Sequence, residues 1–194
     1  FYVPVLDNRG TIRVQESSDG SETGSLGVYA DTVISSGTID LRGAANAESQ
    51  YRRDGGRLNV QADAVFIDGR VLASGGAVAG DSVAGHGGSV YIYTNGGQHH
   101  RGVFELNGGN AVGGEGGDGG YVFLASDGPS YNQARIAADG GDGLVGGDGG
   151  GVFLAGYGGD AWNAGNVAAN GGNGSDGTGG DGGWVNIYAY GGEL

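Results

Sequence analysis

The sequence of 194 residues contains no cysteine, no methionine and no lysine. Without cysteine there is no disulfide scaffold, no thiolate nucleophile and no thiolate metal ligand. Proline occurs only at Pro4 and Pro129, and no Gly-X-Y run with proline exists, which excludes collagen. No hydrophobic stretch approaches the roughly 20 residues needed to cross a bilayer, so we expect no membrane insertion.

Basic charge is also scarce, since nine arginines stand against 22 acidic residues and the net charge is −13. Carboxylates in this excess repel phosphate groups, so we expect no nucleic-acid partner. The chain starts at Phe1 and not at methionine, as after removal of an export signal. We therefore expect an extracellular or cell-surface location.

Glycine, in contrast, supplies 49 residues, about a quarter of the chain, where roughly 7% is usual. Such a composition also occurs in disordered chains. The apolar residues nevertheless alternate in register, which a disordered chain has no reason to do. No long window has helical periodicity, and glycine costs about 1 kcal/mol per helical position, so the pattern favours β-structure.

Two apolar strand patterns recur about every 32 residues. The first begins at Leu26, Leu58, Val90, Val122, Val152 and Val185. The second includes Ile39, Val71, Phe104, Ile136 and Val167. Self-similarity at a fixed period of this size is typical of stacked units that share one long core.

Each repeat consists of a strand, a connection, a second strand and a glycine-rich loop. Because equivalent strands of successive repeats run in the same direction, we predict an all-β fold: a parallel β-solenoid, or right-handed β-helix, of about six coils. Residues 1–24 are expected to form a shortened N-terminal edge coil, with a first strand at Tyr2–Val5 and a second at Thr11–Val14. Residues 25–194 are expected to form the solenoid repeats, all within a single domain.

The glycine-rich stretches have a second period, of three residues. It is present at Gly171, Gly174, Gly177, Gly180 and Gly183, and again in the two preceding repeats. Three residues per turn is the repeat of an extended polyproline-II-like helix, in which glycine permits close packing. We predict ordered, extended, polyglycine-II-like segments stacked beside the coil; flexible surface loops are the alternative.

Polar residues flank these glycines at equivalent positions. Asp118, Asp148 and Asp181 each precede Gly-Gly, as Asp54 and His86 do in earlier repeats. One interpretation is turn chemistry, with side chains bonded to nearby backbone and glycines at positive φ. The other is a calcium site at Asp118, Asp148 and Asp181, since calcium prefers carboxylate oxygens. No other cofactor is expected.

Four aromatic residues at outward positions of the first strand form a strip across neighbouring coils: Tyr91, Tyr93, Phe123 and Phe153. An exposed patch of this kind usually marks a contact surface. The strip can stack on sugar rings, form a subunit interface, or be covered by loops of the protein itself.

Signals of catalysis are poor. The three histidines lack the partner spacing of a zinc site, and no nucleophile elbow or phosphate-binding loop is present. We therefore expect that the protein is not an enzyme.

Glycine-punctuated runs occupy residues 37–43, 55–62 and 87–94. Over roughly residues 25–194 they resemble the repeats of filamentous haemagglutinin-type secreted proteins. This resemblance implies a right-handed parallel β-helix at a bacterial surface that serves adhesion or matrix formation. The coil is long for that family, and its Asn-Pro-Asn-Gly-like secretion signature is missing. The threefold glycine spacing also resembles polyglycine-helix phage tail adhesins.

Neither end of the sequence has a polar cap, although a solitary solenoid needs one to cover its strand edges. We therefore expect a self-assembling extracellular fibre or surface-matrix subunit whose copies stack head to tail. The predicted assembly interface comprises Phe1, Tyr2, Val3, Val5, Trp184, Tyr188 and Tyr190. The alternative is a surface or phage-tail adhesin that binds glycans through the aromatic strip and the glycine-rich loops. A fragment of a longer β-helix would also have uncapped ends.

Overall fold

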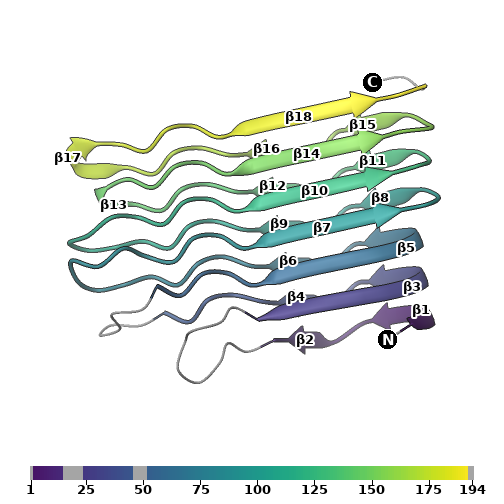
Figure 1. Cartoon of the computed structure of the whole chain (residues 1–194), viewed down its shortest axis with the longest axis horizontal. Coiled ribbons are helices and arrows are strands. Elements are labelled where there is room, and N and C mark those ends of the chain that lie inside the picture. Colours follow the sequence, from purple (N-terminus) through teal and green to yellow (C-terminus); the bar gives the residue numbers. More distant parts are fainter. Residues whose placement is uncertain (1, 15–23, 46–51, 192–194) are drawn as a thin grey trace.

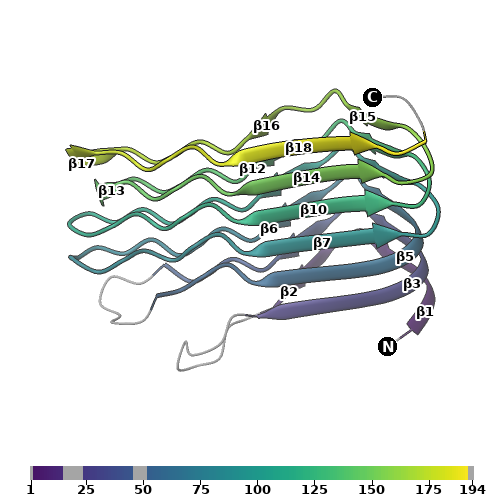
Figure 2. The ribbon, with the colours of Figure 1, turned by 45° about the horizontal axis from the view of Figure 1, so that its top comes forward.

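The computed structural model describes residues 2–14, 24–45 and 52–191, and no helix occurs among them. The chain winds around one axis as a parallel β-solenoid of about five turns, close to the six coils expected. In Figures 1 and 2 the front strands run to the right, the strands behind them return, and successive turns climb, so the winding is right-handed. The predicted fold class is confirmed.

Each turn has three strand-bearing faces, and the pairings on these faces are parallel and in register. The first face consists of the first halves of β3 (Ser25–Ser35) and β5 (Arg57–Ile67), then β7 (Ser89–Thr94), β10 (Tyr121–Ser126), β14 (Gly151–Gly156) and β18 (Trp184–Ala189). The second consists of β1 (Tyr2–Asn8), the second halves of β3 and β5, β8 (Gln98–His100), β11 (Ser130–Asn132) and β15 (Ala161–Asn163). The third consists of β2 (Thr11–Arg13), β4 (Thr38–Asp40), β6 (Arg70–Leu72), β9 (Val103–Glu105), β12 (Arg135–Ala137) and β16 (Val167–Ala168).

The second face corrects two expectations. The segment expected to be a plain connection is itself a strand, so a turn has three strands and not two. Tyr2–Val5, expected as a first-face strand, is only partly one: Tyr2 and Val3 lie opposite Tyr29 and Ala30 at the end of the first face, whereas Val5 lies opposite Thr32 in the second half of β3. The first described turn therefore begins at the end of the first face, and most of β1 lies on the second.

The core lies inside the coil and is made of the predicted apolar columns. Val90, Val122 and Val152 are fully buried in one first-face column, and Phe104 and Ile136 are fully buried on the third face. Side chains of equal shape stacked at a strand spacing of about 4.8 Å pack continuously along the axis. Burial of each such side chain contributes roughly 1.5–3 kcal/mol, which stabilises the stack as a whole.

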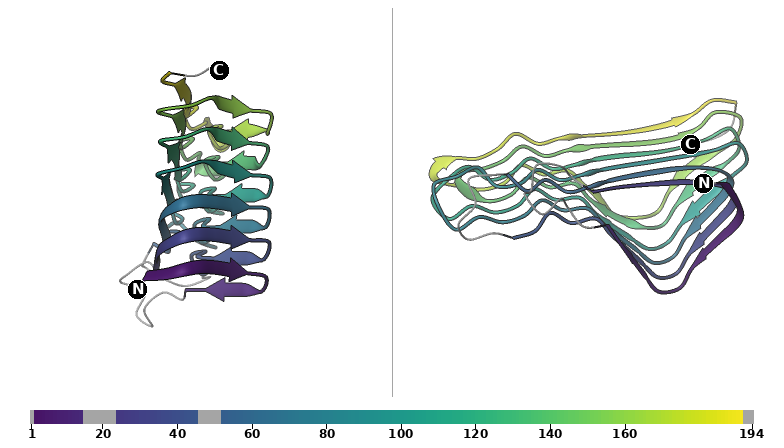
Figure 3. Two further views of the ribbon diagram at one scale, coloured as in Figure 1. Left: turned by 90° about the vertical axis from the view of Figure 1, so that its right-hand side faces the viewer. Right: turned by 60° about the horizontal axis from the view of Figure 1, so that its bottom comes forward.

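The glycine-rich segments project from one edge of the coil as a flat wing of stacked chains, seen beside the triangular coil in Figure 3 (right). The left view of Figure 3 shows the turns layered along the axis. The wing contains β13 (Gly143–Val145) and β17 (Gly174–Thr178). Its segments run out from the third face and return to the first, and they are hydrogen-bonded to one another throughout. The prediction of ordered, extended glycine segments is therefore confirmed.

One triplet shows why the repeat in the wing is three residues. The N–H of Asp118 donates to His86 in the turn before (2.7 Å), and that of Gly119 donates to the Asp148 carbonyl in the turn after (2.7 Å). The N–H of Gly120 donates sideways to the Leu106 carbonyl (2.7 Å). Three successive residues thus bond in three directions, as a threefold extended helix requires.

Packing dictates glycine at two of the three positions. A Cβ at Gly119 would overlap the carbonyl oxygen of Ala138, and a Cβ at Gly120 would overlap that of Gly88. Only the first position of the triplet, occupied by Asp118, has room for a side chain, which accepts the N–H of Asp148 in the next turn. The glycines are therefore needed for close approach and not for an unusual dihedral, since positive φ occurs only at Gly177 and Gly191 among the described glycines.

Candidate functional site

The polar ladders join turns to one another and do not close local turns. Asp118 Oδ1 accepts the N–H of Asp148 (2.9 Å), and Asp148 Oδ1 accepts that of Asp181 (2.7 Å). On the outgoing side of the wing, Asn107 accepts the N–H of Asp139 (3.0 Å) in the same way. In each case a side-chain oxygen accepts the backbone N–H of the next turn, where a β-sheet would use a backbone carbonyl. The prediction that these side chains close local turns with glycines at positive φ is therefore wrong.

The calcium interpretation gains no support from this geometry. One oxygen of Asp118 and one of Asp148 already accept a backbone N–H from the next turn. Among the residues that the structure describes, no group of three or more His, Cys, Asp or Glu side chains could hold a metal ion. Calcium dependence therefore stays an expectation from the sequence.

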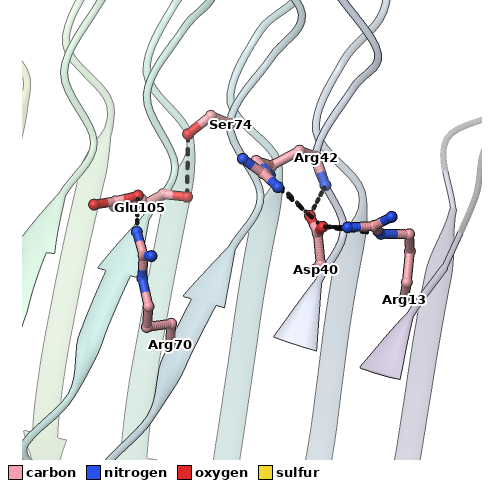
Figure 4. A network of polar contacts seen from close by, with 6 residues as sticks. All are labelled: Arg13, Asp40, Arg42, Arg70, Ser74 and Glu105. Carbon is pink, nitrogen blue, oxygen red and sulfur yellow. Dashed lines mark hydrogen bonds and ion pairs between the residues drawn. The ribbon is translucent and has the colours of Figure 1, made fainter. Parts of the chain in front are cut away.

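Paired charges cover the outer side of the third face (Figure 4). Asp40 accepts from Arg13 (2.8 Å) and from Arg42 (2.9 Å), and Glu105 accepts from Arg70 (3.2 Å). The hydrogen bonds of Arg42, reinforced by those of Arg13, lower the pKa of Asp40 to about 2. The pairs Arg13–Asp40, Arg70–Glu105 and Arg135–Glu105 each join neighbouring turns, so this network supports the stacking of the third face.

The aromatic strip exists and is longer than predicted. Tyr91, Phe123 and Phe153 occupy one outward column of the first face, at half-buried positions. The Phe123 and Phe153 rings are stacked (5.0 Å between centroids, 7° between planes), and Tyr91 is 6.2 Å from Phe123. Tyr188 continues the stack, 5.4 Å from Phe153.

Tyr93 does not belong to this stack. Its register partner in the next turn is Ala125, and its hydroxyl donates to Asp127. Since the residue lies two positions from Tyr91 on the same strand, it falls in a neighbouring outward column that offers it no ring partner in the described structure.

A groove lies where the returning segments of the wing enter the first face, with a volume of about 490 Å³. Its floor is glycine backbone from successive turns, and Tyr121 and Trp184 line its aromatic side. The Trp184 indole lies over Gly151, where a Cβ would collide with it, and reaches the Tyr121 ring at 5.7 Å. The Arg57 guanidinium lies 4.6 Å from the centroid of Tyr91.

The sequence did not point to this groove. Tyr121 and Trp184 are two turns apart, and they meet only because Gly151 between them leaves room for the indole. The one available signal was the register, which places Arg57, Tyr121 and Trp184 in the same outward column.

The residues of the predicted assembly interface lie at both ends. At the N-terminal end Tyr2 and Val5 are exposed and Val3 packs partly against the core, while Phe1 lies outside the described residues. At the other end Trp184, Tyr188 and Tyr190 are exposed. Trp184 turns onto the lateral groove, and Tyr190 stacks on Tyr188 (5.9 Å) and on Tyr157 (5.6 Å).

No protein-family model, curated protein or solved structure was found to match this chain. In the described part, no helix is long and apolar enough to cross a membrane.

Proposed function

We propose that the chain is a non-enzymatic structural protein whose copies stack head to tail into extracellular fibres or a surface matrix. The observation that carries this proposal is the open face of the last turn. Val185 continues a core column whose members Val90, Val122 and Val152 are fully buried, yet it is 42% exposed. The sequence predicted Val185 to be buried like its column, and burial requires a further layer above it.

The glycines of the last turn support the same proposal. Gly149 is required because a Cβ there would collide with Ala169 and Gly183 of the following turn. Gly182 occupies the equivalent position one turn later, and the nearest atom to a Cβ there is 4.0 Å away. Within one copy nothing prevents a larger residue at Gly182, but a further layer stacked on the last turn would require glycine there.

The two ends also complement each other. The first described turn has β1 on the second face and β2 on the third, whereas the last has β18 on the first face. In a stack, β1 would lie on β15, β2 on β16, and the Ser25–Val28 part of β3 on β18, since Tyr29 and Ala30 already pair with Tyr2 and Val3. Such a joint continues all three faces and covers the unpaired strand edges of both copies.

Charge distribution favours this head-to-tail direction. Arg135 is the last basic residue, and seven acidic residues follow it. Arg9 and Arg13 lie at the N-terminal end, where they are paired with Asp7 and Asp40. Contact between two C-terminal ends would bring carboxylates together, which disfavours tail-to-tail contact. Because head-to-tail contact does not close on itself, it produces a filament.

The test is sedimentation velocity over a range of concentrations, with negative-stain electron microscopy of the same samples. The Gly182→Val variant adds a side chain only to the open end face, so it should fold normally and remain monomeric. Gly80→Val is the matched control, since a Cβ there also meets nothing within 4 Å, but Gly80 lies in an inner turn, where its carbonyl accepts the N–H of Gly113 of the next turn. The unsubstituted chain and the control should form filaments. A monomeric unsubstituted chain at high concentration would overturn the proposal.

A second function, a glycan-binding adhesin, is favoured by the half-buried stack of Tyr91, Phe123 and Phe153 on an outer face. The double variant Tyr91→Ala/Phe123→Ala separates the two functions. A fibre subunit should still assemble, because these rings are lateral, whereas an adhesin should lose glycan binding.

A further inference from the structure

We propose that the groove between the wing and the first face binds a neutral oligosaccharide laid along the axis of the molecule. This site lies on the side of the solenoid, so it does not depend on head-to-tail stacking. It would give the second candidate function a defined location, centred on Tyr121 and Trp184 and not on the middle of the aromatic strip.

The floor of the groove is backbone without side chains. A Cβ at Gly87, Gly88, Gly119 or Gly120 would overlap backbone atoms of a neighbouring segment, so these positions accept only glycine. The groove runs past layers from Asp54 to Trp184, four steps of about 4.8 Å, or about 19 Å. A surface of this length suits an extended chain of several sugar rings.

The aromatic side supplies faces on which sugar rings can stack. Trp184 is 45% exposed, and the Tyr91, Tyr121 and Trp184 rings follow one another at 5.4 Å and 5.7 Å. The face of an aromatic ring is electronegative and attracts the polarised C–H groups of a pyranose ring. Trp184 is also held in place by Gly151 beneath it and Tyr121 beside it, which reduces the entropy lost on binding.

The polar groups of the groove carry both signs of charge. Arg57, Ser89 and Asp54 line it, so donors and acceptors for hydroxyl groups are present together. Arg57 is held over Tyr91, with its guanidinium fork available at the side of the groove. The net charge of −13 repels polyanions, which favours a neutral saccharide over an acidic one.

A peptide is a poorer occupant than a sugar. A peptide strand would need free backbone groups, but the floor amides are already bonded, such as Gly87 N–H to Asp118 and Gly88 N–H to Ala73. Peptide recognition by strand addition requires an open edge, and the floor has none. A saccharide needs only stacking surfaces and a few hydroxyl partners.

The test uses Trp184 as its own reporter. The chain has two tryptophans, so Trp162→Phe leaves Trp184 as the single indole fluorophore. Adding Gly182→Val keeps the protein monomeric if the stacking proposal holds, and fluorescence titration does not depend on that outcome. The probes are cellohexaose, chitohexaose and laminarihexaose, with hexagalacturonate and a tyrosine-rich hexapeptide as comparison ligands.

We expect a saturable change in Trp184 fluorescence with at least one neutral hexasaccharide. Tyr121→Ala should weaken that binding by about 10-fold or more, because one stacking face is lost. Tyr131→Ala is the matched control: Tyr131 pairs with Trp162 on the second face and should leave affinity unchanged. Normal circular dichroism of both variants shows that the fold is intact.

Three results would overturn the proposal. The first is no binding of any neutral hexasaccharide at millimolar concentration. The second is binding of hexagalacturonate or the peptide alone. The third is binding that Tyr121→Ala does not weaken, which would place the ligand elsewhere on the molecule.

Discussion

The buried imidazole of His100 makes the stability of the fold sensitive to pH. His100 is fully buried, its Nε2 lies 3.2 Å from Gln98 Oε1, and its ring meets the edge of Phe104 at 5.5 Å. Its Nδ1 has no hydrogen-bond partner within the described structure. Burial, with a smaller contribution from His99, lowers the pKa of His100 to about 3.

Protonation of His100 should therefore favour unfolding. In the unfolded chain the pKa of His100 is about 6.5, so the unfolded state takes up a proton below that pH while the folded state does not. The free energy of unfolding is therefore highest above pH 6.5 and falls as the pH drops toward 3. From about pH 7.5 to pH 5 the expected loss is about 2 kcal/mol. Urea denaturation at both pH values measures it. His100→Gln should remove the loss, while the adjacent control His99→Gln should retain it; equal pH dependence in all three proteins contradicts the prediction.

Asp118, Asp148 and Asp181 form an aspartate ladder, in which like charges one turn apart repel one another. Asp118 and Asp148 nevertheless each accept a backbone hydrogen bond from the next turn. Asn retains the Oδ1 acceptor and removes the charge, so the triple variant Asp118→Asn/Asp148→Asn/Asp181→Asn should be more stable at low salt. Thermal unfolding should show that this advantage shrinks as sodium chloride is added. Asp118→Ala/Asp148→Ala is the control that loses the acceptors, and each lost bond should cost about 1 kcal/mol. If calcium stabilises the unsubstituted chain beyond the effect of ionic strength, the ladder is a metal site.

At the scale of one element, the inner glycines of the wing have no space for a methyl group. Gly119→Ala should destabilise the fold by about 3 kcal/mol or more, because the new Cβ overlaps Ala138 and the backbone must shift. Gly182→Ala, in contrast, should stabilise the fold. Its Cβ meets nothing closer than 4.0 Å, and alanine restricts the unfolded chain, so the folded state should gain about 0.4–1 kcal/mol of stability.

Chemical denaturation of both alanine variants, at concentrations where the chain is monomeric, measures this contrast. Equal effects at the two positions would mean that the packing of neighbouring turns does not dictate the glycines of the wing.

The first and third faces and the wing were predictable, because alternation such as Leu58 and Val60 and the threefold glycine spacing follow from backbone geometry. The second face was not predictable. Its inward columns include Gln98, His100 and Asn132, which are polar and give no apolar alternation although they are buried. They bond to one another or to neighbouring turns, as Gln98 does to Ser130 (2.9 Å), and that pairing exists only after stacking.

The site was predictable to a smaller extent. Tyr91, Phe123 and Phe153 follow from the period, because equivalent positions one turn apart must stack. The Tyr121–Trp184 contact depends on the direction of an indole across two turns, which a strand pattern does not encode.

At the scale of the whole molecule, the lack of cysteine permits a direct test of how copies stack. Gly27 and Asn186 belong to the same outward first-face column, in β3 and β18 at opposite ends. In a head-to-tail stack they would lie in adjacent strands at about 4.8 Å, within the range for a disulfide. Gly27→Cys/Asn186→Cys should therefore give a ladder of covalent oligomers under mild oxidation, visible on a non-reducing gel.

The single variants are the controls for this cross-linking. Gly27→Cys or Asn186→Cys alone can link at most two chains, so neither should exceed a dimer. A double variant that also stops at dimers would contradict head-to-tail stacking.

The parallel in-register pairing of the turns has a consequence for how such a protein can change over generations. Ser89 and Tyr121 occupy equivalent places one turn apart, so removal of residues 89–120 would join Gly88 to Tyr121 in an unaltered backbone path. Duplication of the same stretch would add a turn as smoothly. The gene can therefore lengthen or shorten its product by unequal recombination in steps of about 4.8 Å, with both end faces inherited unchanged.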